Sequence, residues 1–130
     1  MFIQNKDIRL NLVDFYVSDY YRNSMRFYYK SANGIIFIYD VTKKESFNNI
    51  KKWFDEINLY GNEDCKTFKV LIGTKKDSDD RVVSEEEGKQ LAEDNNMVYF
   101  ETSAKNNENV AQVFHFLVNK ILRYRQNKDD

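Results

Sequence analysis

The chain has 130 residues, 42% of them apolar and 15% aromatic, which is enough for one domain with a hydrophobic core and excludes a disordered chain. Its formal net charge of −1 offers no surplus for binding nucleic acid or an anionic membrane surface. The longest uncharged apolar run, residues 34–39, is far shorter than the roughly 20 residues of a membrane-spanning helix, and the first residues lack the pattern of a signal peptide. A single cysteine, Cys65, excludes an internal disulfide and a zinc cluster. We therefore expect a cytoplasmic protein.

The first 31 residues predict a β-hairpin, then an irregular loop that leads into a short helix. Extended runs at residues 2–4 and 8–13 are separated by a turn-like stretch at residues 5–7. In the second run apolar Ile8, Leu10 and Leu12 alternate with polar side chains, which is typical of a half-buried strand. Residues 14–31 are polar and rich in tyrosine.

Beyond residue 33, apolar strands alternate with amphipathic helices. The pattern predicts strands at residues 34–41, 68–72 and 97–100, and helices at residues 45–60, from Glu85 onward and at residues 110–122. Ser84 is a candidate N-cap for the helix that begins with three glutamates. This alternation predicts an α/β fold with a doubly wound, mostly parallel sheet, in which ligands bind beyond the carboxyl ends of the strands.

Three predicted strands end in polar residues that are candidates for ligand binding, and two of these groups suit recognition of a guanine base. These residues are Asp14, the stretch 74–77 (TKKD) and the stretch 101–105 (ETSAK). The carboxylate of Asp77 can accept two hydrogen bonds side by side, which matches the two donors on the guanine edge. The stem of Lys75 can lie along a base face, and the amides of a tight turn at residues 103–105 can donate to a base carbonyl. TKKD by itself is more typical of an ordinary solvated loop.

Together these strand ends resemble the base-recognition motifs of the small GTPases of the Ras superfamily. Residues 27–57 are also similar to the Rab family, in the stretches Tyr29-Lys30-Ser31-Ala32, Tyr39-Asp40-Val41-Thr42 and Ser46-Phe47-Asn48-Asn49-Ile50 and in Trp53. The likeness extends over residues 2–122 and implies the three-layer fold of these GTPases, GTP or GDP as ligand and a role in vesicle trafficking with effector or regulator proteins as partners. It assigns guanine binding to Thr74, Lys75, Asp77, Ser103, Ala104 and Lys105, and support of Mg²⁺ to Asp14.

The sequence also departs from the Rab pattern. No phosphate loop of the form GxxxxGK[ST] occurs in it. The Asp-Thr-Ala-Gly-Gln motif corresponds to residues 14–18, with Val17 in place of the glycine that meets the γ-phosphate and Ser18 in place of the glutamine that positions water. Thr74 replaces the asparagine of the base motif. We therefore predict weak or absent GTP and GDP binding, no catalytic residue, and loss of phosphate binding and hydrolysis in this chain.

The resemblance implies a partial G domain over residues 1–124, which lacks the first strand, phosphate loop and first helix, followed by a polar tail at residues 125–130 without prenylation cysteines or another membrane anchor. Two interpretations remain open. The chain is a Rab-like GTPase whose first part is supplied elsewhere or was lost from the gene model, or it is a degenerate Rab-fold interaction module that does not cycle nucleotide. The altered residues 14–18 favour the second interpretation, and the intact stretches 74–77 and 103–105 favour the first.

In the sheet order of small GTPases, the missing strand lies between the strands predicted here at residues 8–13 and 34–41. Its absence exposes backbone hydrogen-bonding groups on both of them. We expect one of three outcomes: residues 8–13 pair directly with residues 34–41, another chain donates a strand, or the protein aggregates.

Overall fold

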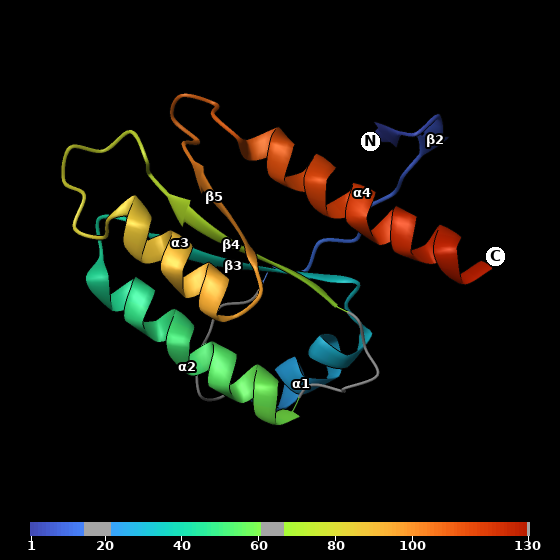
Figure 1. The fold of residues 1–130 in the computed structure, drawn as a ribbon, viewed down its shortest axis with the longest axis horizontal. Coiled ribbons are helices and arrows are strands. Elements are labelled where there is room, and N and C mark those ends of the chain that lie inside the picture. The colour runs from blue at the N-terminus through green and yellow to red at the C-terminus, as the bar shows by residue number, and fades with distance from the viewer. Residues whose placement is uncertain (15–21, 61–66, 130) are drawn as a thin grey trace.

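The computed structural model describes residues 1–14, 22–60 and 67–129 as an α/β fold around one parallel sheet (Figure 1). The sheet contains β3 (Gly34–Asp40), β4 (Phe68–Thr74) and β5 (Val98–Thr102) in the order β3-β4-β5. The helices are α1 (Arg22–Ser31), α2 (Lys44–Tyr60), α3 (Glu85–Asp94) and α4 (Val110–Asp129). Figure 1 shows α2 and α3 side by side, with α4 on the other side of the sheet. None of these helices, within the described ranges, is long and apolar enough to cross a membrane.

The sheet separates two clusters of buried side chains. Phe37, Tyr39 and Leu71 face α2 and α3 and pack against Phe47 and Phe54, among others. On the opposite face, the stripe of α4 that contains Val113 and Leu117 packs against Val70 and Ile72 of β4. The central strand β4 is therefore covered on both sides, as its continuous apolar sequence predicts.

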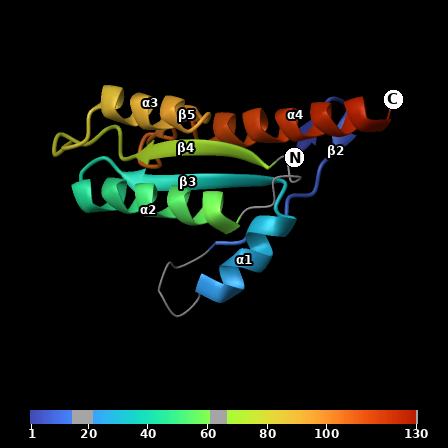
Figure 2. The ribbon, with the colours of Figure 1, turned by 60° about the horizontal axis from the view of Figure 1, so that its bottom comes forward.

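The parallel register brings the carboxyl ends of all three strands to one edge. Asp40 lies opposite Thr74, and Thr74 lies opposite Thr102. Every loop that follows a strand therefore leaves the sheet at this edge, which Figure 2 shows at the left of the molecule.

Most predicted elements are confirmed with small shifts of their ends. Ser84 is the N-cap of α3, and its Oγ accepts a hydrogen bond from the amide of Glu87 at 3.1 Å. Helix α4 continues to Asp129, seven residues beyond the predicted stripe, because the polar residues after Leu122 form further turns of the same helix.

The predicted strand at residues 8–13 is wrong. A hairpin is present, but it pairs β1 (Phe2–Ile3) with β2 (Lys6–Asp7). Its two turn residues, Gln4 and Asn5, have φ of 53° and 60°, which suits the tight turn of a two-residue loop. Residues 8–14 form neither strand nor helix, and Leu12 is 67% exposed. An alternating pattern produces a strand only where a neighbouring strand supplies hydrogen bonds. Ile8 exchanges backbone hydrogen bonds with Met1, at 2.7 and 3.2 Å, but no described segment supplies them to residues 9–13.

Strand β3 is an edge of the sheet among the described residues, so it does not pair with residues 8–13. The amide of Val41 donates to the carbonyl of Thr74 at 3.1 Å, whereas the amide of Asp40 donates to Ser46 Oγ at 3.0 Å. Because direction alternates along a strand, the backbone groups of Ile36 and Ile38 point away from β4, like those of Asp40. Ser46 Oγ accepts the backbone amide at the carboxyl end of this edge strand. The side chain of Ile38, two residues earlier in β3, is 58% exposed.

Candidate functional site

The loops after β4 and β5 meet at the carboxyl edge of the sheet. The amide of Lys76 donates to the carbonyl of Thr102 at 3.1 Å. Ser103 Oγ donates to Asp77 Oδ1 at 2.5 Å. These two bonds join the stretches 74–77 and 101–105, and the bonded pair of Asp77 and Ser103 lies 26 residues apart along the chain. The structure therefore brings together the two groups of residues that the sequence predicts as one site.

The carboxylate of Asp77 is held in its ionised form. The hydrogen bond from Ser103 lowers the pKa of Asp77, and the positive charges of Lys105 and Lys75 lower it further, against a smaller opposing effect of burial. An ionised carboxylate is an acceptor only, so this position selects ligands that present N–H donors.

Ser103 organises the turn that follows β5. Its side chain is fully buried, and its amide and carbonyl exchange two hydrogen bonds with Glu108 at 3.1 and 2.9 Å. Ser103 Oγ also accepts from the amide of Asn106 at 3.0 Å. Among the residues that the structure describes, no acceptor contacts the amide N–H groups of Ala104 and Lys105. Both groups can donate to a base carbonyl.

Lys75 connects the site to the end of β3. It adopts a left-handed backbone conformation with φ of 62°, which is uncommon for a residue with a side chain. Its Nζ lies 2.7 Å from Asp40 Oδ2. Burial raises the pKa of Asp40, but the hydrogen bonds from Lys75 and Thr42 outweigh it and lower the pKa to about 2. The stem of Lys75 is exposed, so its predicted position along a base face stays a prediction.

Thr74 has a different local role from the one that the motif suggests. Its Oγ1 donates to the carbonyl of Tyr39 at 3.0 Å and so links β4 to β3. The hydroxyl oxygen keeps acceptor capacity, but its proton is already used within the sheet.

Asp14 is exposed and belongs to neither strand nor helix. Residues 15–18, which complete its motif, lie outside the described residues. No three acidic, histidine or cysteine side chains in the described ranges gather to hold a metal ion. Mg²⁺ is commonly bound by one or two carboxylates together with substrate phosphates, so Asp14 alone does not make a metal centre, and its role stays a prediction.

A buried polar cluster beneath the site was not predicted from the sequence. Arg81 donates two hydrogen bonds to the carboxylate of Glu101, at 2.8 and 2.5 Å, and Tyr99 Oη donates a third at 2.6 Å. Tyr39 Oη lies 2.7 Å from Tyr99 Oη. The detectable signal was Glu101 itself, a charged residue at the end of an otherwise apolar strand.

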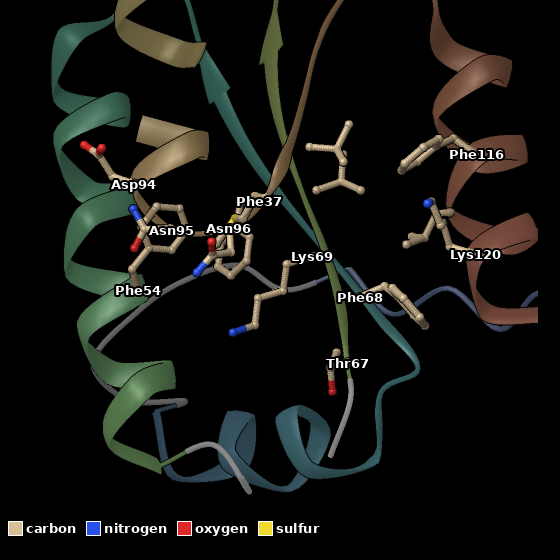
Figure 3. Close-up of a pocket in the computed structure, with 14 residues that line it drawn as sticks. Phe37, Phe54, Thr67, Phe68, Lys69, Asp94, Asn95, Asn96, Phe116 and Lys120 are labelled. Atoms are coloured by element: carbon tan, nitrogen blue, oxygen red, sulfur yellow. The ribbon is translucent and has the colours of Figure 1, made fainter. Parts of the chain in front are cut away.

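A cavity of about 510 Å³ lies away from this site, at the amino ends of β4 and β5. Figure 3 shows Phe37, Phe54 and Phe68 around it, with Lys69 and Asn96 at its polar side. None of the predicted guanine-binding residues lines it. The cavity and the carboxyl-edge loops are therefore separate features.

Comparison with known proteins decides the family. The sequence model described as the Ras family matches residues 1–123. The chain belongs to the Ras family. This Ras-family assignment agrees with the parallel sheet and with the position of both base motifs at its carboxyl edge.

Rab-like members of the Ras family are among its relatives. The chain is 42% identical to the Ras-related protein RIC1 of Oryza sativa subsp. japonica, over 89% of this chain and 57% of the rice protein. It is 37% identical to the Ras-related protein SEC4 of Saccharomyces cerevisiae, over 92% of this chain and 54% of the yeast protein. It is 41% identical to the Ras-related protein Rab-3 of Caenorhabditis elegans, over 93% of this chain and 55% of the worm protein. The chain thus spans about half the length of these curated relatives.

Proposed function

We propose that this Ras-family chain recognises the base of guanine nucleotides through Asp77, Ala104 and Lys105, and acts in Rab-type regulation of vesicle trafficking. The observation that carries the proposal is the hydrogen bond between Ser103 and Asp77, which joins the two base motifs at one edge of the sheet. The likeness to Rab-type relatives supports effector or regulator proteins as its partners.

The chemistry of the edge favours guanine over adenine. The ionised carboxylate of Asp77 accepts from the N1–H and the exocyclic amine of guanine, while the amides of Ala104 and Lys105 donate to O6. Adenine presents an acceptor at N1 and a donor at position 6, so both contacts are mismatched. A few such hydrogen bonds, at about 1–3 kcal/mol each before the cost of ordering the ligand, give a dissociation constant of roughly millimolar.

Residues 14–18 bear on the hydrolytic step. Phosphoryl transfer in this family relies on positioning and electrostatic stabilisation by loop amides, a lysine, Mg²⁺ and a residue that orients the attacking water. Ser18 lacks the reach and the amide of the expected glutamine, and Val17 brings a branched side chain to the position of a glycine. We therefore propose that GTP hydrolysis is lost in the 130 residues, and that tight phosphate binding requires residues other than these.

A titration with two nucleotides tests base recognition. GDP at millimolar concentration should shift the NMR amide signals of Asp77, Ala104 and Lys105, and ADP should not. Asp77→Ala should abolish the GDP response. Asp80→Ala removes an exposed carboxylate from the same loop and serves as the matched control, so it should leave the response intact. Equal shifts with ADP, or an unchanged response in Asp77→Ala, would contradict the proposal.

The interaction module that does not cycle nucleotide is the second candidate, and Val17 and Ser18 favour it. The nucleotide content of the purified protein separates the two candidates. We expect no tightly bound nucleotide when the protein is denatured and the supernatant is analysed by anion-exchange chromatography. Stoichiometric GDP would reject the second candidate and our estimate of the affinity together.

A further inference from the structure

The buried cluster beneath the site has a defined direction of hydrogen bonding. Tyr99 has one hydroxyl proton and donates it to Glu101, so the proton between the two tyrosines belongs to Tyr39. Glu101 therefore accepts from Tyr99 and twice from Arg81 and is the centre to which the other side chains connect. Burial raises the pKa of Glu101, but the bonds from Arg81 and Tyr99 outweigh it and keep the pKa below its ordinary value.

The surrounding backbone is shaped to fit this cluster. A Cβ added at Gly88 of α3 would lie 2.4 Å from the hydroxyl oxygens of Tyr39 and Tyr99. A Cβ added at Gly73 of β4 would lie 2.9 Å from Tyr39 Oη and 3.0 Å from Tyr99 Oη. Glycine at both positions leaves room for the paired hydroxyls between the sheet and α3, which fixes where Glu101 can lie.

The cluster and the predicted base site form one closed ring. Arg81 follows Asp77 by four residues, and Ser103 follows Glu101 by two. The ion pair of Arg81 and Glu101 closes one side of this ring, and the bond from Ser103 to Asp77 closes the other. The backbone carbonyl of Glu101 also accepts from Asn109 Nδ2 at 2.8 Å, which ties the residue that follows the turn at residues 103–108 to the end of β5.

We propose that Glu101 is a positioning residue that, through Arg81 and Tyr99, holds Ser103 against Asp77 and so sets the spacing of the groups that recognise guanine. Short rings restrict the relative motion of their members, because each closing bond limits the conformations left to the other. Only the last step, the effect on guanine, rests on the proposed function. The effect on the geometry of Asp77 and Ser103 stands on the contacts alone.

The pKa of the Asp77 carboxyl, measured by NMR titration of its side-chain carbon, tests the geometry without a nucleotide. Glu101→Gln removes a negative charge, and that change alone would lower the pKa of Asp77. Loss of positioning has the opposite sign, because the bond from Ser103 is the largest cause of the low pKa of Asp77. We expect the pKa of Asp77 to rise in Glu101→Gln. Ser103→Ala removes the bond directly and shows the full rise for comparison.

Three further variants keep the test decisive. Glu87→Gln in α3 breaks the exposed ion pair with Lys44 by the same chemical change and should leave the pKa of Asp77 unaltered. Arg81→Lys keeps the charge but loses the two-pronged contact, so it should give a smaller rise than Glu101→Gln. Should Glu101→Gln fail to fold, Tyr99→Phe, which removes a single bond to Glu101, should show the rise in a reduced form. A folded Glu101→Gln or Tyr99→Phe protein with an unchanged or lowered pKa of Asp77 would overturn the proposal.

The GDP titration adds a second readout. Glu101→Gln should weaken the GDP-induced shifts of Ala104 and Lys105 several-fold, whereas Glu87→Gln should retain them. An undiminished GDP response in Glu101→Gln would overturn the positioning role in recognition. If the wild-type chain gives no guanine-specific response, the proposed function fails, and the pKa measurement still decides whether Glu101 positions the two loops.

Discussion

The carboxyl edge of the sheet and residues 8–14 differ in how completely their side chains are buried and hydrogen-bonded. At the carboxyl edge, Glu101 is buried and its carboxylate accepts three side-chain hydrogen bonds. Ser103 is fully buried, and its hydroxyl, amide and carbonyl are all hydrogen-bonded. Around residues 8–14, by contrast, apolar Leu12 and Val13 are largely exposed. The carboxyl edge brings together the loops after β4 and β5, whereas within residues 8–14 only Ile8 is hydrogen-bonded to another described residue, Met1. Burial here therefore depends on neighbours and not on side-chain polarity.

The largest difference should appear when the same side chain is shortened in both regions. Leu71→Ala in β4 removes a side chain with no exposed surface and should lower the free energy of unfolding by about 3 kcal/mol. Leu12→Ala should change it by less than about 0.5 kcal/mol, because Leu12 packs against little. Urea unfolding followed by circular dichroism measures both values. A comparable loss in the two variants would show that residues 8–14 belong to the core.

The polar cluster should be the next most sensitive part. Glu101→Ala leaves Arg81 and the Tyr99 hydroxyl without their acceptor and should cost about 2–3 kcal/mol, with the partial exposure of Arg81 reducing the loss. Glu87→Ala, in the exposed pair with Lys44, should cost much less, because water screens an exposed ion pair. Thermal unfolding of the two variants compares them directly. Equal losses would mean that Glu101 is not the centre of the cluster.

Acid should weaken the contact between β3 and the loop after β4. The pKa of Asp40 is about 2 in the folded protein and 3.8 in the unfolded chain. The ionised carboxylate therefore stabilises the fold above about pH 4. That contribution, about 1 kcal/mol because Lys75 is exposed, should disappear as the pH falls from 4 to 2. Unfolding of the wild type and of Asp40→Asn across this range tests the effect. The wild type should lose more stability than the variant, and parallel curves would contradict the role of the ion pair.

The smallest effect on stability should accompany a clear effect on association. Among the described residues no strand pairs with the outer edge of β3, so the backbone groups of Ile36 and Ile38 there can bind extended segments of other molecules. The wild-type chain should therefore self-associate as its concentration rises. Ile38→Lys places a charge on this edge and should suppress association with less than about 0.5 kcal/mol change in stability. Val82→Lys, at a similarly exposed position away from the sheet edge, is the control. Sedimentation velocity should detect only the monomer for Ile38→Lys, and association for the wild type and Val82→Lys. Equal association of all three proteins would exclude β3 as the contact.

The proximity of the stretches 74–77 and 101–105 was predictable because both are local and lie directly at strand ends. TKKD and ETSAK could be placed at the same edge as soon as β4 and β5 were recognised as parallel strands, and the structure puts Asp77 in contact with Ser103. The role of Glu101 was not predictable because, although Tyr99 lies two residues before it in β5, Arg81 comes from a loop 20 residues away along the chain. Its spatial relation to Gly88 and Tyr39 exists only in the folded protein.

The sequence by itself determined the alternation of strands and helices after residue 33, the N-cap at Ser84 and the placement of the stretches 74–77 and 101–105 at strand ends, because each depends on side-chain periodicity or on a short run of residues. Tertiary structure alone decided the conformation of residues 8–13, whose apolar and polar side chains alternate as in a strand but which do not form one in the fold. A strand requires the hydrogen-bonding edge of a neighbour, and its own side chains carry no information about whether that neighbour is present. The same reason explains the cluster around Glu101, since a buried charge is stable only where separate parts of the chain bring donors to it.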